Sequence, residues 1–390
     1  MAADHFDVII VGGGPVGMAL AICLNQRKVS TLLLEAQGLP EQVQDPRPLA
    51  LSYGSHLILQ KLGVWETLQQ ITFIKTIHIS NRGHFGRTLL TSEEAGVPTL
   101  GYVVNYHDLY RSMHQLLLDH GVNYQTGAMV SRLAAGAKQA QIEYQQAEEN
   151  KQATAKLLVL ADGGRLAAQI ESISYHTHEY QQWAVVANVE TSIPQNGVAY
   201  ERFTSDGPVA LLPSGNGYAL VWTVPSLSAK EILSLDDSTF LLHLQHHFGD
   251  RLGKFVSSGG RSGFPLALKH ASPTTATRTV LVGNAAQTLH PVAGQGFNLG
   301  LRDAWELFNE INGLSSLSTQ IGTSEMLKAY ESKRRIDRDA GKIFTHSLAK
   351  IFTSDLPLIQ TFSSLGLSVL DCLPPVKRFV ARRMIFGVRG

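Results

Sequence analysis

The chain has 390 residues, of which 44% are hydrophobic and 17% are charged, and its formal net charge is +1. This length allows two or three domains with a sizeable buried core. The small net charge excludes a protein that binds nucleic acid mainly by electrostatic attraction, so any basic character must be local. The two cysteines, Cys23 and Cys372, are far apart in apolar surroundings. They indicate a reducing compartment and neither a disulfide framework nor a metal site.

Membrane and export signals are absent from the sequence pattern. The chain passes from MAADHFD directly into VIIVGGG, so we expect no signal peptide. The best candidate for a membrane span, residues 356–373, is interrupted by Gln360, Thr361, several serines and Asp371. We therefore expect a soluble, cytoplasmic protein, with peripheral contact to the inner membrane left open.

The first 35 residues have the pattern of two strands joined by a helix. Residues 7–11 (DVIIV) predict a short buried strand that leads into a glycine cluster. Residues 16–26 have helical composition, and residues 30–35 (STLLLE) predict a second buried strand. Strand, turn, helix and strand within about 30 residues indicate a βαβ unit. Later, residues 109–120 predict a helix and residues 156–160 (KLLVL) another buried strand.

From about residue 180 the pattern changes. The segments AVVANVET, VAYERFT, GPVALLP and GYALVWTVP are short alternating strands separated by turn residues, which predicts an antiparallel sheet. Residues 76–80 (TIHIS) have the same pattern and are candidates for this sheet. Residues 280–282 return to a buried strand of the parallel type, so the first domain is expected to be interrupted and resumed.

We therefore expect an α/β protein with a Rossmann-like domain, an inserted and mainly antiparallel β domain for the substrate, and a helical C-terminal region. The expected boundaries are 1–72, 99–178 and 270–323 for the discontinuous first domain, 73–98 and 179–269 for the substrate domain, and 324–390 for the helical region.

The first motif that carries chemistry is VIIVGGGPVGMAL, in which Gly12, Gly14 and Gly17 occupy the G-x-G-x-x-G positions. Gly12 permits the tight turn, Gly14 lets a pyrophosphate approach the backbone, and Gly17 lets the helix pack on the strand. Glu35 ends the second strand, where a carboxylate accepts from the ribose hydroxyls of a dinucleotide and disfavours a 2′-phosphate. The expected nucleotide is FAD or NAD. A plain glycine-rich turn with an edge glutamate is the alternative.

Two later motifs add candidate cofactor residues. LLVLADGG places Asp162 and Gly163 after a buried strand, as cofactor contacts or simply as a turn. Residues 283–303 read GNAAQTLHPVAGQGFNLGLRD, where the glycines leave room for a flat ring and the following helix offers free N–H groups to the negative charge of a reduced flavin. The candidates in this stretch are Gly283, Asn284, Pro291, Gly294, Gln295, Gly296 and Asn298.

In their order and spacing, these three motifs resemble those of the class A flavoprotein monooxygenases, over most of residues 1–345. The resemblance implies a p-hydroxybenzoate-hydroxylase-like FAD-binding domain, in which the strand end contacts the ribitol of FAD and the P-x-x-G-Q-G turn lies beside the flavin ring. Asn284 and Gln287 stand where the family usually has Asp and His. An amide still bonds a ribitol hydroxyl, so the flavin site is expected to persist. Leu166 and Gln169 replace a usual Ser and Arg, which weakens any inference about nicotinamide docking near Asp162.

Within the family, five segments are similar to the ubiquinone-biosynthesis branch, the 2-polyprenyl-6-methoxyphenol hydroxylases in particular. They are GNAAQTLHPVAGQGFNLGLRD, YERFTSDGPVALLP, RSGFPLAL, HISNRGH and DPRPLALSYGSHLILQKLGVW. The resemblance implies an FAD enzyme that uses NAD(P)H and O₂ to hydroxylate a prenylated phenol through a C4a-hydroperoxyflavin. It also implies that Arg47 approaches the flavin or its phosphates; a surface arginine is the alternative.

Such chemistry needs little from side chains, because the cofactor carries it. His290 is our one candidate for a catalytic polar group, and a histidine satisfied by the backbone of a tight turn is the alternative. No metal ligands are expected. The antiparallel sheet is expected to form a wall of the substrate pocket. Its candidate lining residues, which would otherwise be sheet core, are Tyr200, Phe203, Pro213 and Trp222.

The last segment, residues 374–390 (PPVKRFVARRMIFGVRG), carries five basic residues and no acid. If this segment is a helix, it has one broad apolar face. Such a face is compatible with docking on anionic lipid, with packing on its own domain or with packing on other ubiquinone-biosynthesis proteins. That face contains Val376, Phe379, Val380, Met384 and Phe386.

Two other functions stay open. A flavin-dependent reductase of isoprenoid double bonds shares this architecture and consumes no oxygen. A noncatalytic flavoprotein subunit of a quinone-synthesis complex is consistent with the altered surroundings of Asp162. A plain NAD dehydrogenase is disfavoured, because it has no use for the late ring-side motif.

Overall fold

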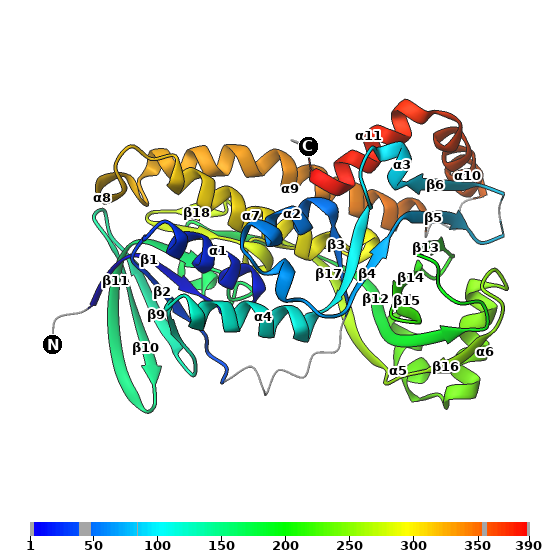
Figure 1. Cartoon of the computed structure of the whole chain (residues 1–390), viewed down its shortest axis with the longest axis horizontal. Coiled ribbons are helices and arrows are strands. Elements are labelled where there is room, and N and C mark those ends of the chain that lie inside the picture. Colours follow the sequence, from blue (N-terminus) through cyan, green and yellow to red (C-terminus); the bar gives the residue numbers. More distant parts are fainter. Residues whose placement is uncertain (1–3, 39–47, 84, 353–356, 388–390) are drawn as a thin grey trace.

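The computed structural model describes residues 4–38, 48–83, 85–352 and 357–387, which form three sheets and a set of covering helices (Figure 1). The first sheet has eight strands, and its parallel part runs in the order β19-β11-β1-β2-β8. Its strands are β1 (Asp4–Val11), β2 (Thr31–Leu34), β8 (Asn123–Gln125), β9 (Met129–Ala135), β10 (Ala140–Gln146), β11 (Glu149–Leu160), β18 (Thr275–Ala276) and β19 (Thr279–Leu281).

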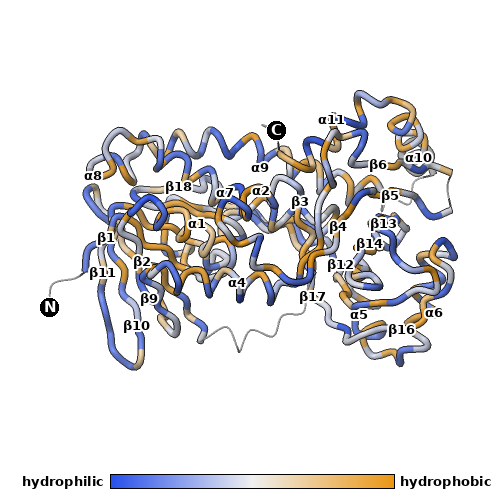
Figure 2. The backbone as a smooth tube through the Cα atoms, viewed as in Figure 1, coloured by the Kyte–Doolittle hydropathy of each residue, from blue (hydrophilic) through white to orange (hydrophobic). Residues whose placement is uncertain are grey.

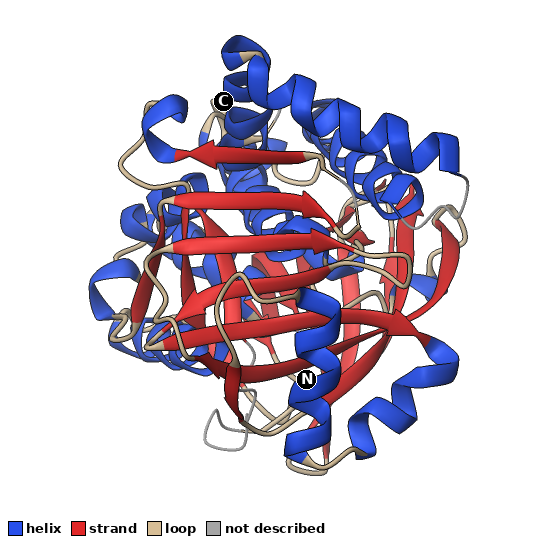
Figure 3. Ribbon diagram, turned by 90° about the vertical axis from the view of Figure 1, so that its right-hand side faces the viewer, coloured by secondary structure: helices blue, strands red, loops and turns tan. Residues whose placement is uncertain are grey.

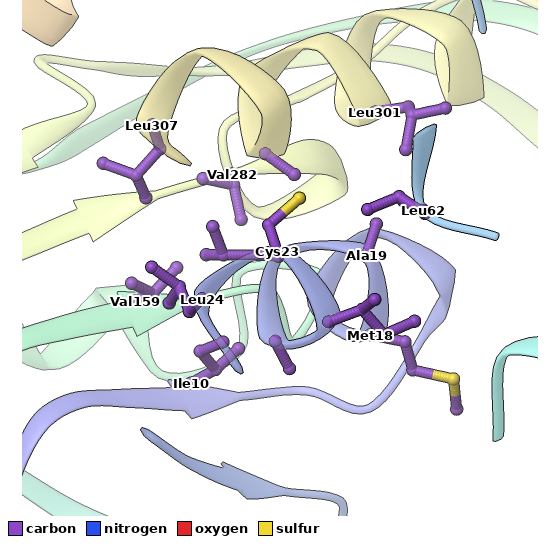
Figure 4. Close-up of a cluster of buried hydrophobic side chains, with 14 of the residues drawn as sticks. Ile10, Met18, Ala19, Cys23, Leu24, Leu62, Val159, Val282, Leu301 and Leu307 are labelled. Carbon is purple, nitrogen blue, oxygen red and sulfur yellow. The ribbon is translucent and has the colours of Figure 1, made fainter. Parts of the chain in front are cut away.

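The centre of this sheet is fully buried, as expected when helices or loops cover both faces. Helix α1 (Pro15–Gln26) joins β1 to β2 and packs on one face, and its surroundings are almost wholly apolar (Figure 4). Cys23 lies in this cluster, and burial raises the pKa of its thiol to about 12. Figure 2 shows the apolar residues concentrated along these central strands and α1.

The second sheet has nine strands in the order β20-β17-β12-β15-β14-β13-β5-β6, with β16 beside β12. Figure 3 shows the molecule from the side on which this sheet lies. Its strands are β5 (Thr76–Asn81), β6 (Arg87–Thr91), β12 (Ser174–Thr191), β13 (Val198–Phe203), β14 (Val209–Ser214), β15 (Gly217–Pro225), β16 (Phe255–Ser258), β17 (Ser262–Ser272) and β20 (Gln287–Thr288). The predicted membership of residues 76–80 is confirmed, although β5 pairs with β13 in parallel.

Between the two large sheets lies a three-stranded sheet in the order β3-β7-β4. Its strands and the neighbouring helices are β3 (Pro48–Ser52), β4 (Ile71–Ile74), β7 (Gly101–Asn105), α2 (Tyr53–Lys61), α3 (Ser92–Ala95) and α4 (Tyr106–Asp119), with a 3-10 turn at Trp65–Thr67. The sequence pattern did not reveal this sheet, because β3 and β7 are joined by pairing across about fifty residues of chain.

The remaining helices follow the antiparallel strands and the late glycine motif. They are α5 (Ser226–Ser234), α6 (Asp237–Phe248), α7 (Gln295–Asn312), α8 (Leu317–Gln320), α9 (Ser324–Phe352), α10 (Pro357–Cys372) and α11 (Pro374–Phe386), with 3-10 turns at Ala167–Gln169, Gly283–Ala285 and Val292–Gly294. Within the described part of the chain, no helix has both the length and the hydropathy needed to cross a bilayer.

The predicted fold class is confirmed, and the elements differ from prediction mainly at their ends. Helix α4 begins at Tyr106, three residues before the predicted start, because the Asn105 side chain accepts from the His107 amide and caps it. Strand β11 extends well before residue 156, since β10 pairs with its first half. Strands β12 and β17 pair from Ser174↔Ser272 onward, across two of the predicted domain limits, and the limits themselves stay predictions.

Candidate functional site

The turn after β1 has the shape that its glycines predict. Gly12 has φ +112°, and a Cβ there would lie 2.5 Å from the Ala161 backbone. A Cβ on Gly17 would lie 2.0 Å from the Gly12 carbonyl oxygen, so the helix packs as closely as only glycine permits. A Cβ on Gly14, the N-cap of α1, would meet nothing within 4 Å. Gly12 and Gly17 therefore close the turn, while Gly14 faces open space at a helix N-terminus.

Glu35 follows β2 directly and lies beside this turn. One carboxylate oxygen accepts from the Gly13 amide at 2.6 Å and the other from the Gln37 amide at 2.8 Å. Each oxygen has a second lone pair to offer. The Glu35 side chain is thus fixed next to the glycine turn, at the position where the sequence predicts a contact with the ribose hydroxyls.

The motif of residues 283–303 packs against helix α1. Gly283 has φ +60°, and a Cβ on Gly300 of α7 would lie 3.0 Å from the Gly283 Cα and 3.1 Å from a Val16 methyl group. The end of β19, the start of α1 and the second turn of α7 therefore meet without space between them. Asn284 follows in this turn, and its exposed side chain lines the main cavity.

The P-x-x-G-Q-G turn leads into α7. Gly294 is left-handed with φ +59° and is the N-cap, and a Cβ there would lie 2.9 Å from the Ala50 Cβ. A Cβ on Gly296 would meet nothing within 4 Å. Pro291, Gly294 and Gly296 line the main cavity, whereas Gln295 lines a small separate pocket against α11. No acidic residue occupies the first turn of α7, so its N-terminal field stays positive.

Asn298 is buried, and its side chain is fully engaged within the protein. Its oxygen accepts from the Ser52 amide at 2.8 Å and the Ser55 hydroxyl at 2.7 Å. Its NH₂ group donates to the carbonyls of Ala50 at 2.8 Å and Gly294 at 2.7 Å. This amide therefore clamps β3 and α2 to the ring-side turn. The contact of Asn298 with the cofactor stays a prediction. Its backbone N–H would have to make that contact, because the side chain is already engaged.

A buried charge network lies beneath the late motif. Asp303 is fully buried and accepts from the Gly283 amide, the Gln287 side chain and, at 2.7 Å, the Arg334 guanidinium. Arg334 also donates to Asp337 at 2.6 Å. Gln287, which departs from the usual family residue, thus has a structural partner. Sequence reasoning missed Arg334, since α9 gave no local signal for this contact.

Asp162 caps its own turn. One carboxylate oxygen accepts from the Gly164 amide at 3.0 Å and the other from the Leu166 amide at 2.8 Å. Gly163 has φ +75°, as the turn requires. Neither residue lines the main cavity. Their geometry suits the turn alternative, and cofactor contact stays a prediction. Arg47 lies outside the described residues.

His290 is completely buried between two residues that line the cavity, Leu289 and Pro291, but it does not line the cavity itself. Its Nδ1 accepts from the Val292 amide at 3.2 Å, and its ring packs edge-on against Tyr180. Burial lowers the pKa of the imidazole to about 4, so it is neutral at physiological pH. The geometry matches the alternative given above, a histidine whose Nδ1 is hydrogen-bonded by the backbone of a tight turn.

The main cavity has a volume of about 540 Å³ and reaches from the glycine motifs to the nine-stranded sheet. Of the predicted wall residues, Tyr200 and Phe203 line it, whereas Pro213 and Trp222 do not. Trp222 lies in the core on the other face of that sheet, against Phe240, and the Tyr200 ring packs on that same face against Tyr218 and Phe248 although the residue borders the cavity. Side chains alternate between the two faces of a strand, so aromatic character alone could not select the right face.

These residues fit a flavin dinucleotide. Among the predicted cofactor residues, Gly14, Gly283, Asn284, Pro291, Gly294 and Gly296 line one end of a single cavity. Gly14 and Gly296, at the N-termini of α1 and α7, have open space where a side chain would stand. Backbone N–H groups at one helix would face the pyrophosphate, and those at the other would face the flavin ring.

Comparison with known proteins agrees with this class of site. The FAD binding domain family matches residues 5–339. The chain belongs to this family, and it is a flavin-dependent aromatic monooxygenase that binds FAD and uses NAD(P)H and O₂.

Individual relatives cover nearly the whole chain. Ubiquinone hydroxylase UbiL of Rhodospirillum rubrum is 31% identical, over 96% of this chain and 88% of that protein. The 3-demethoxyubiquinol 3-hydroxylase of Escherichia coli is 28% identical, over 97% and 98%. Among solved structures, p-nitrophenol 4-monooxygenase PnpA of Pseudomonas putida superposes with a TM-score of 0.78 at 14% identity, over 99% and 100% of the two chains. That likeness shows the shared fold.

Proposed function

We propose that this protein hydroxylates the aromatic ring of a polyprenylated methoxyphenol in ubiquinone biosynthesis, with 2-polyprenyl-6-methoxyphenol as the favoured substrate. The observation that carries the proposal is the composition of the main cavity. Past the glycine motifs, its described wall is almost wholly apolar. A cavity that begins at a flavin site and continues as an apolar chamber suits an aromatic head with a hydrocarbon tail.

One wall is a row of neighbouring strands. Ile79, Glu201, Ala210, Val221 and Val186 follow one another across β5, β13, β14, β15 and β12, and all of them line the cavity. Glu201 is the one carboxylate on the described wall. Glu201 on β13 and Thr288 on β20 are the polar residues of this sheet whose side chains are our candidates for orienting the phenol oxygen.

The opposite wall comes from the C-terminal helices. Apolar side chains of α9, α10 and α11 close the cavity over the sheet, and they are Phe344, Leu348, Leu367, Leu370, Val380 and Met384. Burying a tail against such a wall is favourable by about 25 cal/mol per Å² of apolar surface. The same wall excludes water from the reacting centre.

The cofactor and the protein have separate roles in this reaction. Bound FAD, reduced by NAD(P)H, supplies the activation of O₂. The protein holds the dinucleotide at Gly12, Gly14, Gly17 and Glu35, and it holds the ring end at the turn from Pro291 to Gly296. It then positions the aromatic ring and excludes water. We assign His290 a supporting role in this turn, through the bond from the Val292 amide.

The printed names of the relatives support the substrate class. UbiL is named a ubiquinone hydroxylase, and the Escherichia coli protein is named a 3-demethoxyubiquinol 3-hydroxylase. We propose a cytoplasmic protein that meets its lipid substrate at the inner membrane.

The test is turnover by the purified, FAD-loaded protein with a prenylated methoxyphenol. We expect NAD(P)H oxidation and oxygen uptake that depend on the phenol, and a product heavier by one oxygen atom. Unprenylated p-nitrophenol serves as the comparison substrate and should be turned over far more slowly. Reduction of the tail without oxygen uptake would instead favour a reductase of isoprenoid double bonds. FAD that is never reduced with any phenol would favour a noncatalytic subunit.

A further inference from the structure

Helices α10 and α11 have two apolar faces, of which only one is covered. Leu367, Leu370, Val380 and Met384 point into the main cavity. A second set, which we name the outer stripe, is 45–58% exposed to solvent. The outer stripe consists of Leu365, Val369, Leu373, Val376 and Phe379. Leu365 and Val369 are four residues apart on α10, and Val376 and Phe379 are three residues apart on α11, so each pair lies on one side of its helix. Leu373 lies between the two pairs, at the N-cap of α11.

This arrangement corrects the single broad face expected for the last helix. Val380 and Met384 line the cavity, whereas Val376 and Phe379 are exposed. Ala381 and Ile385 are buried against the neighbouring hydrophobic cluster. The helix packs on its own protein and also leaves the side chains of Val376 and Phe379 in solvent.

The surroundings of the outer stripe are basic. Helix α11 contains no acid, and Arg378 is exposed on it. The Arg383 guanidinium lies 4.9 Å from the ring centre of Phe379. Lys377 is neutralised by Glu94 at 2.7 Å and Asp371 at 3.4 Å. On α3, which packs against α11, the further charged group is the exposed Glu93. Glu94 and Asp371 together carry one negative charge more than Lys377 offsets, and Glu93 adds a second. The three arginines of α11, of which the third is Arg382, still outweigh these two acids beside the outer stripe.

Both helices are tied to the rest of the protein, α11 through the ion pair of Lys377 with Glu94 of α3 and α10 through two hydrogen bonds. The Thr88 hydroxyl donates to the Leu367 carbonyl at 2.8 Å, and the Leu89 amide donates to Asp371 at 3.0 Å. Both bonds tie α10 to β6, which lies beside these helices in Figure 1. The outer stripe is therefore a fixed surface of the folded protein.

We propose that the outer stripe and its arginines dock the protein on a bilayer that contains anionic lipid, and that the prenyl tail passes from that bilayer past α10 and α11 into the cavity. The proposal rests on the function proposed above. Apolar side chains flanked by guanidinium groups match the interface of an anionic bilayer. Helices α10 and α11 also form one wall of the cavity, so a tail that leaves the bilayer beside them enters the cavity over a short distance.

The test is co-sedimentation of the FAD-loaded full chain with vesicles. We expect binding to vesicles of phosphatidylcholine with phosphatidylglycerol, weaker binding to phosphatidylcholine alone, and release at high salt. The double variant Leu373→Glu/Phe379→Glu should lower partitioning roughly tenfold or more. The matched control is Leu227→Glu, at the most exposed apolar residue of α5, which lies at the opposite edge of the molecule in Figure 1; it should bind as the wild type does.

Activity separates this proposal from the proposed function. With a water-soluble methoxyphenol carrying one prenyl unit, both variants should retain wild-type turnover and bound FAD. With a long-tailed phenol in vesicles, the double variant alone should lose turnover. Turnover of the short phenol without any vesicle binding, or vesicle binding unchanged in the double variant, would overturn the docking surface and leave the hydroxylase standing. Binding of a protein partner in place of vesicles at these residues would overturn it as well. No turnover of the short phenol by the wild type would count against the proposed function itself.

Discussion

Asn298 lies at the point where the ring-side turn meets β3 and α2, and all four of its side-chain hydrogen bonds end on protein groups. Replacing it by Ala leaves the buried Ser52 amide and Ala50 carbonyl without these bonds. We expect the free energy of unfolding to fall by about 3 kcal/mol, together with weaker FAD binding. Urea unfolding and flavin titration measure the two effects. Asn312→Ala, at the exposed end of the same helix, is the control and should change neither.

Asn284 differs from Asn298 in being exposed to the cavity. We expect Asn284→Asp to bind FAD within about tenfold of the wild-type affinity, a change below about 1.4 kcal/mol, because either side chain accepts from a ribitol hydroxyl. A flavin titration followed by fluorescence checks this. Complete loss of binding in a folded variant would refute the assigned role of Asn284.

His290 makes stability depend on pH. Its pKa is about 4 in the folded protein and about 6.5 when exposed, so the unfolded chain binds the proton first as the pH falls. The stability is full above pH 6.5 and is lost between about pH 6.5 and 4, by about 3 kcal/mol from this group. In His290→Gln the acid loss should be smaller by that amount, as urea unfolding at several pH values would show. His243→Gln, on an exposed part of α6, should keep the wild-type slope.

At this scale, glycine positions were the most predictable feature. The steric need for Gly12 and Gly17 follows from a local motif, and the structure has those close contacts. The clamp at Asn298 could not be predicted in the same way, because Ser52 and Ser55 lie more than 240 residues earlier in the chain.

Among the elements, α7 shows how one helix serves two purposes. Gly296 has open space beside it, whereas Gly300 contacts Gly283 and Val16. We expect Gly300→Ala to cost about 1–3 kcal/mol of stability, because α7 must move away from α1. Gly296→Ala should leave stability unchanged or slightly higher and weaken FAD binding, since its methyl group enters the space for the ring. Thermal unfolding without FAD and flavin titration separate the two. Equal effects of the two variants on both measurements would contradict this division.

The link between α7 and α9 depends on a buried ion pair. Arg334 contacts Asp303 and Asp337, and Asp303 in turn holds the Gly283 amide. Arg334→Met should destabilise the protein by about 3–5 kcal/mol, because it leaves Asp303 buried and uncompensated. Chemical unfolding measures this. The exposed ion pair of Lys151 with Glu149 offers a control, and Lys151→Met should cost about 1 kcal/mol or less.

For whole elements, periodicity predicted type better than extent. The apolar run at residues 156–160 predicted a strand, yet the first half of β11 is set by its partner β10. The last helix was predicted with one apolar face, but its neighbours divide that face between the cavity and solvent. Partners of this kind are distant in sequence and leave no local pattern.

At the scale of the molecule, three motifs were enough to predict the fold class, because each performs a steric task that few folds share. The cavity was beyond sequence reasoning. Its walls combine β5 with β13, which pair across more than 120 residues of chain, and side chains from α9, α10 and α11. It is this assembly of distant segments that joins the predicted flavin site to an apolar chamber.

The central claim is that this chamber presents a prenylated phenol to oxygen activated at the flavin. The most direct measurement is turnover of a prenylated methoxyphenol by the FAD-loaded protein with NAD(P)H under oxygen gas enriched in oxygen-18, followed by mass spectrometry of the product. We predict one oxygen-18 atom on the aromatic ring, with one NAD(P)H consumed for each product molecule. A product whose new oxygen comes from water, or a product formed equally well without oxygen, would contradict the claim.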